Sequence, residues 1–543
     1  MLHDIFIPLD GLNGAKDGYK AVAKIVDWPE EAKNPIGEIT HVLGKQGDNN
    51  AEMNAILADY GFPLAFPDSV EKEAEAIEEK ISAEEISKRK DFRNVLTFTI
   101  DPADAKDFDD AISFRKLANG NTEVGVHIAD VSYYVEKGSA LDKEAFERGT
   151  SVYLVDRVIP MLPERLSNGL CSLRPNEDKL CYSAVFELDD EANVIEQWFG
   201  RTIIHSDTRF SYEDAQEILE NKTGKHSEEL LKLNALAYKL RDRKFKHGAI
   251  SFESVEIKFR LDEQGKPTGV YVKERKDAHK LIEDFMLLAN KKVAEFIAKK
   301  GKGKQKLTFV YRAHDSPKED ALLSFSQFAS KFGYKIDMSS GRETARSLNY
   351  LMADVEGKKE QNVLTQLAIR SMAKAIYTTK KHSHYGLAFD YYTHFTSPIR
   401  RYPDVMVHRL LDLYLAGGKS VNEEEYEKLS MHASQMEKKA ADAERASVKY
   451  KQAEFLQNNI GEEFNGIISG LTEWGMYVEI IENKCEGMIR LRDLNDDFYV
   501  LDEKNYCIIG QRRKKKYQLG DEVKIMVKKV DLSKRQIDFT LVR

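Results

Sequence analysis

One short segment of the sequence carries residues whose type and spacing could do chemistry. In TIDPADAKDFDDAISF, four aspartates (Asp101, Asp107, Asp109 and Asp110) fall within ten residues, and strand-like residues bracket them. Carboxylates this close repel one another unless a positive charge lies among them. Short side chains that offer only oxygen ligands suit Mg²⁺, or alternatively Mn²⁺, rather than zinc. Two such ions about 4 Å apart could activate a water and stabilise the leaving oxygen when a phosphodiester is cleaved.

The same segment has a second interpretation. Aspartates often cluster in solvated turns, and on charge alone a turn and a metal site both stay open. An EF-hand loop is excluded, because the sixth position counted from Asp107 is Ile112 rather than glycine. In an extended chain Asp107 and Asp109 share a face, whereas Asp110 points elsewhere.

The elements that must position this segment fall into several domains, because 543 residues exceed what one hydrophobic core usually holds. Residues 92–457 have strand-like runs early and helical runs late, which predicts an α+β domain. Residues 1–66 and 458–543 contain short strands separated by turn residues. Each is therefore predicted to be a small OB-fold β-barrel, with five strands in the first. Residues 67–91 are acidic with helical periodicity, which predicts a connecting helix. The expected fold class is α+β multidomain.

The charge balance limits how the chain could contact a polyanion. With 82 Lys and Arg against 90 Asp and Glu, the formal net charge is −8, whereas simple nucleic-acid binders are usually basic. Contact with nucleic acid must therefore be confined to a patch, or use a bound cation. No apolar run approaches the roughly 18 residues that span a membrane, and no signal peptide opens the chain, which predicts a cytoplasmic protein without a membrane partner. The four cysteines lack zinc spacing and are predicted to be reduced and buried.

Three further stretches complete a pattern with the aspartate segment. They are TSVYLVDRVIPMLPERLSNGLCSLRPNEDKL (150–180), EDFMLLAN (283–290) and YYTHFTSPIRRYPDVMVHRLL (391–411). Together they strongly resemble the RNB catalytic domain of the RNase II/RNase R exoribonucleases, with wording closer to bacterial RNase R. Residues 1–66 resemble the second cold-shock domain of that family, and residues 461–543 resemble its S1-type RNA-binding domain. The resemblance implies a processive 3′→5′ exoribonuclease that hydrolyses single-stranded RNA to 5′-mononucleotides with Mg²⁺.

The resemblance also assigns the metal and catalytic residues. The four metal-site aspartates of the family match Asp101, Asp107, Asp109 and Asp110, and the third of them, Asp109, is also implied in catalysis. The catalytic arginine matches Arg400 in TSPIRRYPD. Its planar guanidinium suits the charge that grows on the oxygens of a scissile phosphate.

Two residues beside Arg400 bear on this assignment. A structural arginine paired with a carboxylate such as Asp404 is the alternative interpretation of Arg400. Arg401 is expected to contact the backbone or an RNA phosphate.

Aromatic residues are expected to hold the unpaired strand, since stacking on a base tolerates any sequence. Tyr153 matches the family tyrosine that packs against the 3′-terminal nucleotide. Phe252 matches the phenylalanine at the other end of the stacked nucleotides, with a core phenylalanine as the alternative. Glu444 matches a helix glutamate that contacts the terminal nucleotide, with a solvated helix residue as the alternative.

The C-terminal barrel offers its own candidates for contact with RNA. Trp474 and Tyr477 are predicted to meet RNA, with strand packing as the alternative for both. The basic run from Arg512 to Lys516 fits steering of phosphates, with simple solvation as the alternative.

Two other functions stay open at this point. One is an RNase II-type exonuclease without activity on duplexes, and the other is a non-catalytic RNA-binding protein on the same fold. The chain also departs from the family, which usually has another cold-shock domain before the first barrel and, in RNase R, often a Lys-rich tail after the last. Whether the native protein has these further segments stays open. We expect a monomer.

Overall fold

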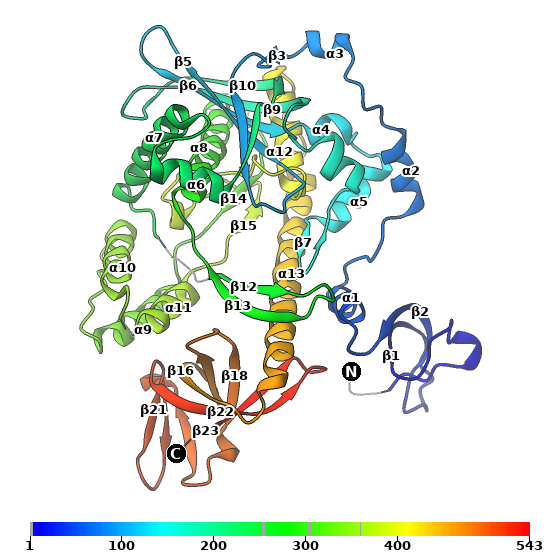
Figure 1. The fold of residues 1–543 in the computed structure, drawn as a ribbon, viewed down its shortest axis with the longest axis vertical. Coiled ribbons are helices and arrows are strands. Elements are labelled where there is room, and N and C mark those ends of the chain that lie inside the picture. The colour runs from blue at the N-terminus through cyan, green and yellow to red at the C-terminus, as the bar shows by residue number, and fades with distance from the viewer. Residues whose placement is uncertain (1–3, 252–255, 302–305, 359, 543) are drawn as a thin grey trace.

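The structure is a computed structural model that describes residues 4–251, 256–301, 306–358 and 360–542. Figure 1 shows a central sheet with helices packed around it, a small N-terminal domain to one side and a β-barrel at the C-terminal end. One long helix, α13 (Glu423–Leu456), runs from the central domain down to the barrel. The predicted α+β multidomain fold class is confirmed.

The N-terminal domain has fewer strands than predicted. Among residues 4–66 the structure has two antiparallel strands and one isolated bridge between Phe6 and Ile36, so the prediction of five strands is wrong for this part of the chain. The strands are β1 (Tyr19–Asp27) and β2 (Ile36–Lys45).

A helix takes up much of the remaining chain in this domain. It is α1 (Asn49–Asp59), and its residues Met53, Ile56 and Leu57 are fully buried. Apolar residues three and four positions apart share one face of a helix, whereas a strand would place Ile56 on the opposite face from Met53 and Leu57. That face packs against α13, which ties the N-terminal domain to the long helix.

The connecting segment is also broken where one helix was predicted. It forms two short helices, α2 (Asp68–Ala76) and α3 (Ala83–Ser87), with Ile77 in an extended conformation between them. The Arg165 side chain donates to the carbonyl oxygens of Ala74 at 2.8 Å and Ile77 at 2.6 Å. A tertiary contact thus satisfies the carbonyls at the end of α2 and allows the chain to leave the helix.

The central sheet has seven strands in the order β11-β4-β5-β6-β9-β10-β3. The inner strands pair antiparallel, and each edge strand runs parallel to its neighbour. The strands are β3 (Lys90–Asp91), β4 (Thr97–Asp101), β5 (Asp110–Lys116), β6 (Thr122–Ala129), β9 (Asp178–Leu188), β10 (Val194–His205) and β11 (Thr208–Ser211).

Helices pack on this sheet and enclose one large core with it. They are α4 (Val131–Tyr134), α5 (Ala140–Arg148), α6 (Tyr212–Asn221), α7 (Ser227–Lys246), α8 (Asp277–Lys300) and α12 (Tyr402–Leu415). A separate lobe contains α9 (Glu319–Ser330), α10 (Gly341–Val355) and α11 (Gln361–Ser371). Three small strand pairs complete the domain: β7 (Val152–Tyr153) with β8 (Val158–Ile159), β12 (Glu256–Leu261) with β13 (Pro267–Lys273), and β14 (Tyr311–Ala313) with β15 (Ile376–Thr378).

The C-terminal domain is the closed five-stranded barrel that the sequence predicted, in the order β16-β17-β18-β23-β22. A three-stranded sheet, β19-β20-β21, is inserted between β18 and β22. The barrel strands are β16 (Glu463–Leu471), β17 (Gly475–Ile480), β18 (Glu486–Arg490), β22 (Glu522–Asp531) and β23 (Gln536–Leu541), and the inserted strands are β19 (Tyr499–Asp502), β20 (Cys507–Gly510) and β21 (Lys516–Gln518).

Two sequence-level expectations concern the whole chain. All four cysteines are free and buried, as predicted. Across the described ranges, every helix is either too short or too polar to cross a lipid bilayer.

Candidate active site

Two neighbouring strands bring the clustered aspartates together. β4 ends at Asp101 and β5 begins at Asp110, and the strands pair antiparallel through Phe98 and Ile112. The loop between them therefore starts and finishes at the same edge of the sheet. This return of the chain carries Asp107 and the buried Asp109 back beside Asp101.

The carboxylates of this cluster share a poorly solvated space. Burial raises the pKa of Asp109 to about 8 and the pKa of Asp101 and of Asp110 to about 7, and it also raises the pKa of Asp107. The charges of Asp107 and Asp109 raise the pKa of Asp101 further, and the charge of Asp101 does the same for Asp110. Burial and mutual repulsion disfavour full ionisation, so a nearby cation would restore the charged forms. A freely solvated turn, the alternative interpretation, does not fit this burial.

The donor set fits a hard divalent cation. Oδ2 of Asp101 is buried and has no hydrogen-bond partner among the described residues. Because buried polar atoms are normally paired, this oxygen is suited to bind a ligand such as a metal ion. In the ranges that the structure describes, no three acidic, histidine or cysteine side chains gather closely enough to hold an ion by themselves. Mg²⁺ in nucleotide and nucleic-acid sites is commonly bound by one or two carboxylates, with waters and substrate phosphates as the other ligands. The aspartates fit that kind of site.

Arg400 is anchored directly to this cluster. Asp109 accepts the backbone N–H of Ile399 at 2.9 Å through Oδ1 and the Nε–H of Arg400 at 3.2 Å through Oδ2. The Arg400 side chain is 41% exposed, and its Nη2 donates to Ser397 at 2.8 Å. The guanidinium therefore lies at the open edge of the aspartate cluster with one side fixed.

The alternative pairing of Arg400 with Asp404 is not what the structure contains. Asp404 instead accepts from Nη2 of the adjacent Arg401 at 2.7 Å, and both side chains are largely buried. Arg401 therefore lies beneath the site and supports the beginning of α12.

Buried side chains fix the loop that leads to Arg400, and the sequence analysis missed them. Asn290 accepts the backbone N–H of Phe395 at 2.8 Å, and His408 contacts the carbonyl oxygen of the same residue at 2.7 Å. Asp404 accepts the N–H of Ser397 at 2.8 Å. Asn290 ends the EDFMLLAN motif, so a signal for it was present. Its contact with Phe395 depends on the packing of α8 beside the loop, which the sequence does not show.

Tyr153 lies close enough to the cluster to interact with Arg400 and Asp107, and its contact with a nucleotide stays a prediction. The bridge between Thr150 and Arg401 joins the start of its segment to the Arg400 loop. Burial raises the pKa of the Tyr153 hydroxyl, and the charges of Arg400 and Asp107 act on it in opposite directions. The residue is still 38% exposed, so part of its surface is available to a ligand.

The chain matches three family models in sequence order: a cold shock domain over residues 1–67, an RNB domain over residues 89–417 and an S1 RNA binding domain over residues 457–541. It is 40% identical to Ribonuclease R of Thermotoga maritima, and this match covers 99% of this chain and 77% of that protein. The chain belongs to the ribonuclease R family. The family and the 3′-5′ exoribonuclease activity predicted from the motifs are thereby confirmed.

Other relatives agree with this assignment. Ribonuclease R 1 of Lactococcus lactis is 40% identical over 93% of this chain, which spans 62% of that protein. The solved structure of Mycoplasma genitalium RNase R in complex with ribose methylated single-stranded RNA aligns with a TM-score of 0.92 at 26% identity, over 99% of this chain and 85% of that one. The same enzyme in complex with double-stranded RNA aligns with a TM-score of 0.87 at 25% identity, over 99% of this chain and 92% of that one.

Of two further predicted RNA contacts, one faces a hairpin of the central domain and the other lies outside the described residues. Glu444 is exposed on α13, and burial raises the pKa of its carboxyl, with Lys258 of β12 opposing and Glu256 adding to the rise. It therefore faces the β12–β13 hairpin in this structure, and its contact with a terminal nucleotide stays a prediction. Phe252 lies outside the described residues.

The barrel aromatics differ in their exposure. Trp474 is 72% exposed in the turn between β16 and β17, where a base could stack on it. Tyr477 of β17 is half-buried beside Gly470, where a Cβ would lie 3.4 Å from the Tyr477 ring. Trp474 therefore fits a contact with RNA, whereas part of the Tyr477 surface is used in packing. The role of each stays a prediction.

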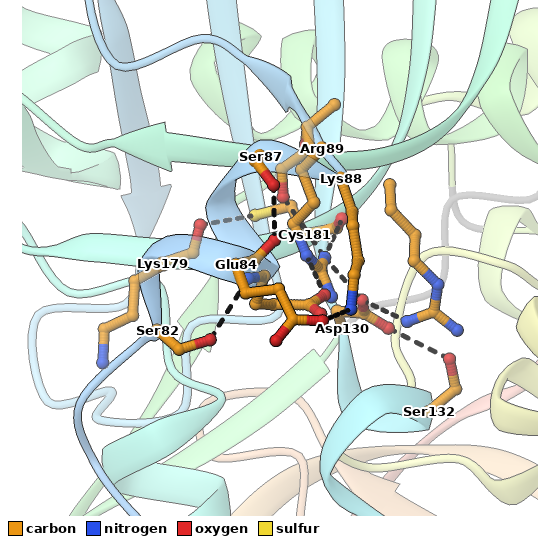
Figure 2. A network of polar contacts seen from close by, with 12 residues as sticks. Ser82, Glu84, Ser87, Lys88, Arg89, Asp130, Ser132, Lys179 and Cys181 are labelled. Atoms are coloured by element: carbon orange, nitrogen blue, oxygen red, sulfur yellow. Dashed lines mark hydrogen bonds and ion pairs between the residues drawn. The ribbon is translucent and has the colours of Figure 1, made fainter.

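A buried ion-pair network supports the sheet beneath the site. Asp130 accepts from Nη1 of Arg89 at 2.7 Å and from Nη1 of Arg201 at 2.5 Å, and Figure 2 shows Arg89 reaching it from the chain after α3. Both Asp130 and Arg89 have fully buried side chains. His127 contacts Ser183 at 2.7 Å in the same sheet. Because neighbouring protein groups already bind these polar atoms, their role is structural.

Proposed function

We propose that this chain degrades single-stranded RNA from the 3′ end at the Asp101–Asp110 cluster and that it depends on Mg²⁺, with Mn²⁺ as a substitute. The observation that carries the proposal is the anchoring of Arg400 on Asp109 at the edge of a buried carboxylate cluster. Relatives of this architecture have been solved with RNA bound, which supports RNA as the partner.

Divalent ions, when bound, would activate a water and stabilise charge on the leaving oxygen. Asp101 and Asp110 are the residues proposed to hold them, because the charge of Asp101 raises the pKa of Asp110 and Oδ2 of Asp101 has no hydrogen-bond partner among the described residues. Asp107 and Asp109 complete the acidic cluster. Oxygen-only ligands at this site exclude zinc as the preferred metal.

Arg400 is proposed to act on the scissile phosphate. Its Nε is used by Asp109 and its Nη2 by Ser397, while among the described residues its Nη1 has no hydrogen-bond partner. An N–H group in this position can donate to a non-bridging phosphate oxygen, on which negative charge grows during the reaction. Asp109 keeps that donor in place before the substrate arrives, so less reorganisation is needed in the transition state.

Tyr153 is proposed to pack against the terminal nucleotide. Its ring is partly exposed next to Arg400, so a base or ribose bound there would place the last phosphodiester near the guanidinium. A stacked contact selects unpaired nucleotides without selecting sequence. The predicted cytoplasmic location and monomeric state stay predictions.

The proposal is tested with one RNA labelled at either end. With Mg²⁺, label at the 3′ end is expected to appear at once as mononucleotide, whereas label at the 5′ end stays on long RNA until late. EDTA is expected to abolish the release of mononucleotides, and Asp109→Asn is expected to slow it at least about tenfold. Asp104→Asn is the matched control, because Asp104 lies in the same loop and is exposed. Intact RNA under every condition, with binding retained, would favour a non-catalytic RNA-binding protein.

A duplex with a 3′ overhang separates the two catalytic alternatives. Degradation into the paired region indicates the behaviour expected from the resemblance to RNase R. A stop at the edge of the duplex would indicate a single-strand-only exonuclease.

A further inference from the structure

The three-stranded sheet inserted in the C-terminal domain brings an aromatic residue and a basic loop to one end. Tyr499 pairs with Gly510 at the start of β19 and the end of β20. Phe498 precedes this pair, and its carbonyl oxygen accepts the N–H of Gln511 at 2.8 Å. The loop that follows Gln511 carries the basic run, so Phe498 lies next to it in space.

An aspartate fixes the shape of this basic loop. Asp497 accepts the backbone N–H of Arg512 at 3.0 Å through Oδ1 and that of Arg513 at 2.6 Å through Oδ2. The backbone N–H bonds lower the pKa of Asp497 against the effect of its burial, so the carboxylate is charged at neutral pH. Gly510 leaves the room for it, since a Cβ there would lie 2.5 Å from Asp497 Oδ2.

The side chains of the loop point to solvent. All five residues from Arg512 to Lys516 are exposed, in a chain whose formal net charge is −8. Asp497 binds the loop through its backbone, which leaves the guanidinium groups available for other anions. A local concentration of positive charge on an acidic protein attracts a polyanion to that place alone.

Phe498 adds a second observation. Its side chain is 67% exposed, although a phenylalanine in water gains nothing from that position. An exposed aromatic ring beside exposed cations is the combination by which proteins hold single-stranded nucleic acid, with stacking of bases and neutralisation of phosphates. An acidic protein partner would use the charges but would not require the ring.

We propose that Phe498 and the loop Arg512–Lys515 form a holding site for single-stranded RNA, outside the barrel and separate from the aspartate cluster. A base stacks on Phe498 while the phosphates beside it contact Arg512 and Arg513. This site binds a part of the RNA strand upstream of the terminal nucleotides. That placement rests on the proposed function, in which the 3′ end lies at the aspartate cluster. It therefore increases the affinity for long RNA and leaves hydrolysis of short RNA unchanged.

Binding without hydrolysis tests the site directly. RNA oligonucleotides of about 5 and about 40 nucleotides are titrated in EDTA and followed by fluorescence anisotropy. Phe498→Ala is expected to weaken binding of the long RNA at least about fivefold, which is the lower limit for loss of one stacked base. Phe498→Tyr is expected to restore it. The double variant Arg512→Ala/Arg513→Ala is expected to reduce the slope of log K against log salt by about 1.4, since each phosphate contact with a single strand contributes about 0.7.

Controls separate this proposal from the proposed function. Lys529→Ala removes an exposed cation from β22 in the same domain and is expected to bind long RNA as the wild type does. Release of mononucleotides from the short RNA is expected to be the same in every variant. A wild type that binds long RNA but hydrolyses none of it would overturn the proposed function and leave this site standing. Unchanged binding of long RNA by both the Phe498→Ala and the double variant would overturn the site. Polyglutamate, titrated in the same way, represents an acidic protein partner, and variants that lose binding to polyglutamate but not to RNA would also overturn the site.

Discussion

The substitution Asp109→Asn tests how the acidic cluster controls Arg400. Asp109 holds the Arg400 loop through Ile399 and the guanidinium through Nε. Asparagine keeps one acceptor oxygen, which can still receive the N–H of Ile399. Its NH₂ group then faces Nε–H of Arg400, so a donor meets a donor and the anchor is lost.

The expected loss follows from that contact. A hydrogen bond to a charged group contributes about 1.5–3 kcal/mol, and the partial exposure of Arg400 places this one at the lower end. Loss of the anchor alone predicts a decrease in kcat of at least about tenfold. Removal of one donor that stabilises the transition state typically costs about 100- to 1000-fold, which sets the upper end. The fold is expected to be unaffected, because the amide oxygen of asparagine can still accept the backbone N–H of Ile399.

Single-turnover hydrolysis of 5′-labelled RNA measures the effect, with thermal unfolding and RNA binding in EDTA as checks on the fold. The exposed residue Asp104, substituted to Asn, is the control from the same loop. Arg400→Lys and the double variant complete a cycle. If Asp109 acts through Arg400, the double variant is no slower than the slower single variant. Losses that multiply would show independent roles and refute the reasoning.

Three more predictions concern the site and the sheet beneath it. Arg400→Lys keeps the charge but loses the planar guanidinium, so kcat is expected to fall about 100-fold or more while the Kd for RNA in EDTA changes less than threefold. Equal fold-changes in kcat and in Kd would show a role in binding alone. Tyr153→Ala is expected to raise KM for a short RNA and to leave longer end products, because the contact with one nucleotide is lost. Tyr153→Phe is expected to behave as the wild type. An unchanged length of the end product in Tyr153→Ala would contradict this prediction. Asp130→Asn is expected to lower the free energy of unfolding by about 3 kcal/mol at pH 7, the lower end for breaking a buried ion pair, since Nη1 of Arg89 loses its carboxylate while Nε keeps Glu85. Burial raises the pKa of Asp130, but Arg201 and Arg89 outweigh burial and lower it, so the charged form stabilises the fold above the unfolded pKa of about 4. The difference in unfolding free energy between wild type and variant is therefore expected to narrow as the pH falls below that value. A difference that does not change with pH in urea titrations would count against the ion pair.

The sequence was sufficient for those parts of the site that lie in one segment. Asp101 to Asp110 are close in the chain, so their charges indicated a metal site, with a solvated turn as the alternative, before any fold was known. Tyr153 and Arg400 were placed there only through the family motifs, because no periodicity shows that β7 and the loop before α12 meet. The β-bridge between Thr150 and Arg401 brings these two segments together, although they are about 250 positions apart in the chain.

Local patterns failed where tertiary contacts decide the backbone. The acidic segment after α1 has helical periodicity throughout, yet α2 ends at Ala76, where Arg165 binds the carbonyl oxygens of Ala74 in the helix and Ile77 after it. Asn290, His408 and Asp404 look like ordinary polar residues of helices in the sequence. Their function depends on which loop lies over them, and that is fixed only by the packing of α8 and α12.

A divalent ion in the buried carboxylate cluster is the central claim, and anomalous diffraction from crystals grown with MnCl₂ tests it most directly. The account predicts an anomalous peak within ligand distance of Asp101 and Asp110, lost in the Asp101→Asn variant. A fully ordered cluster without such a peak, at a Mn²⁺ concentration that supports hydrolysis of RNA, would contradict it.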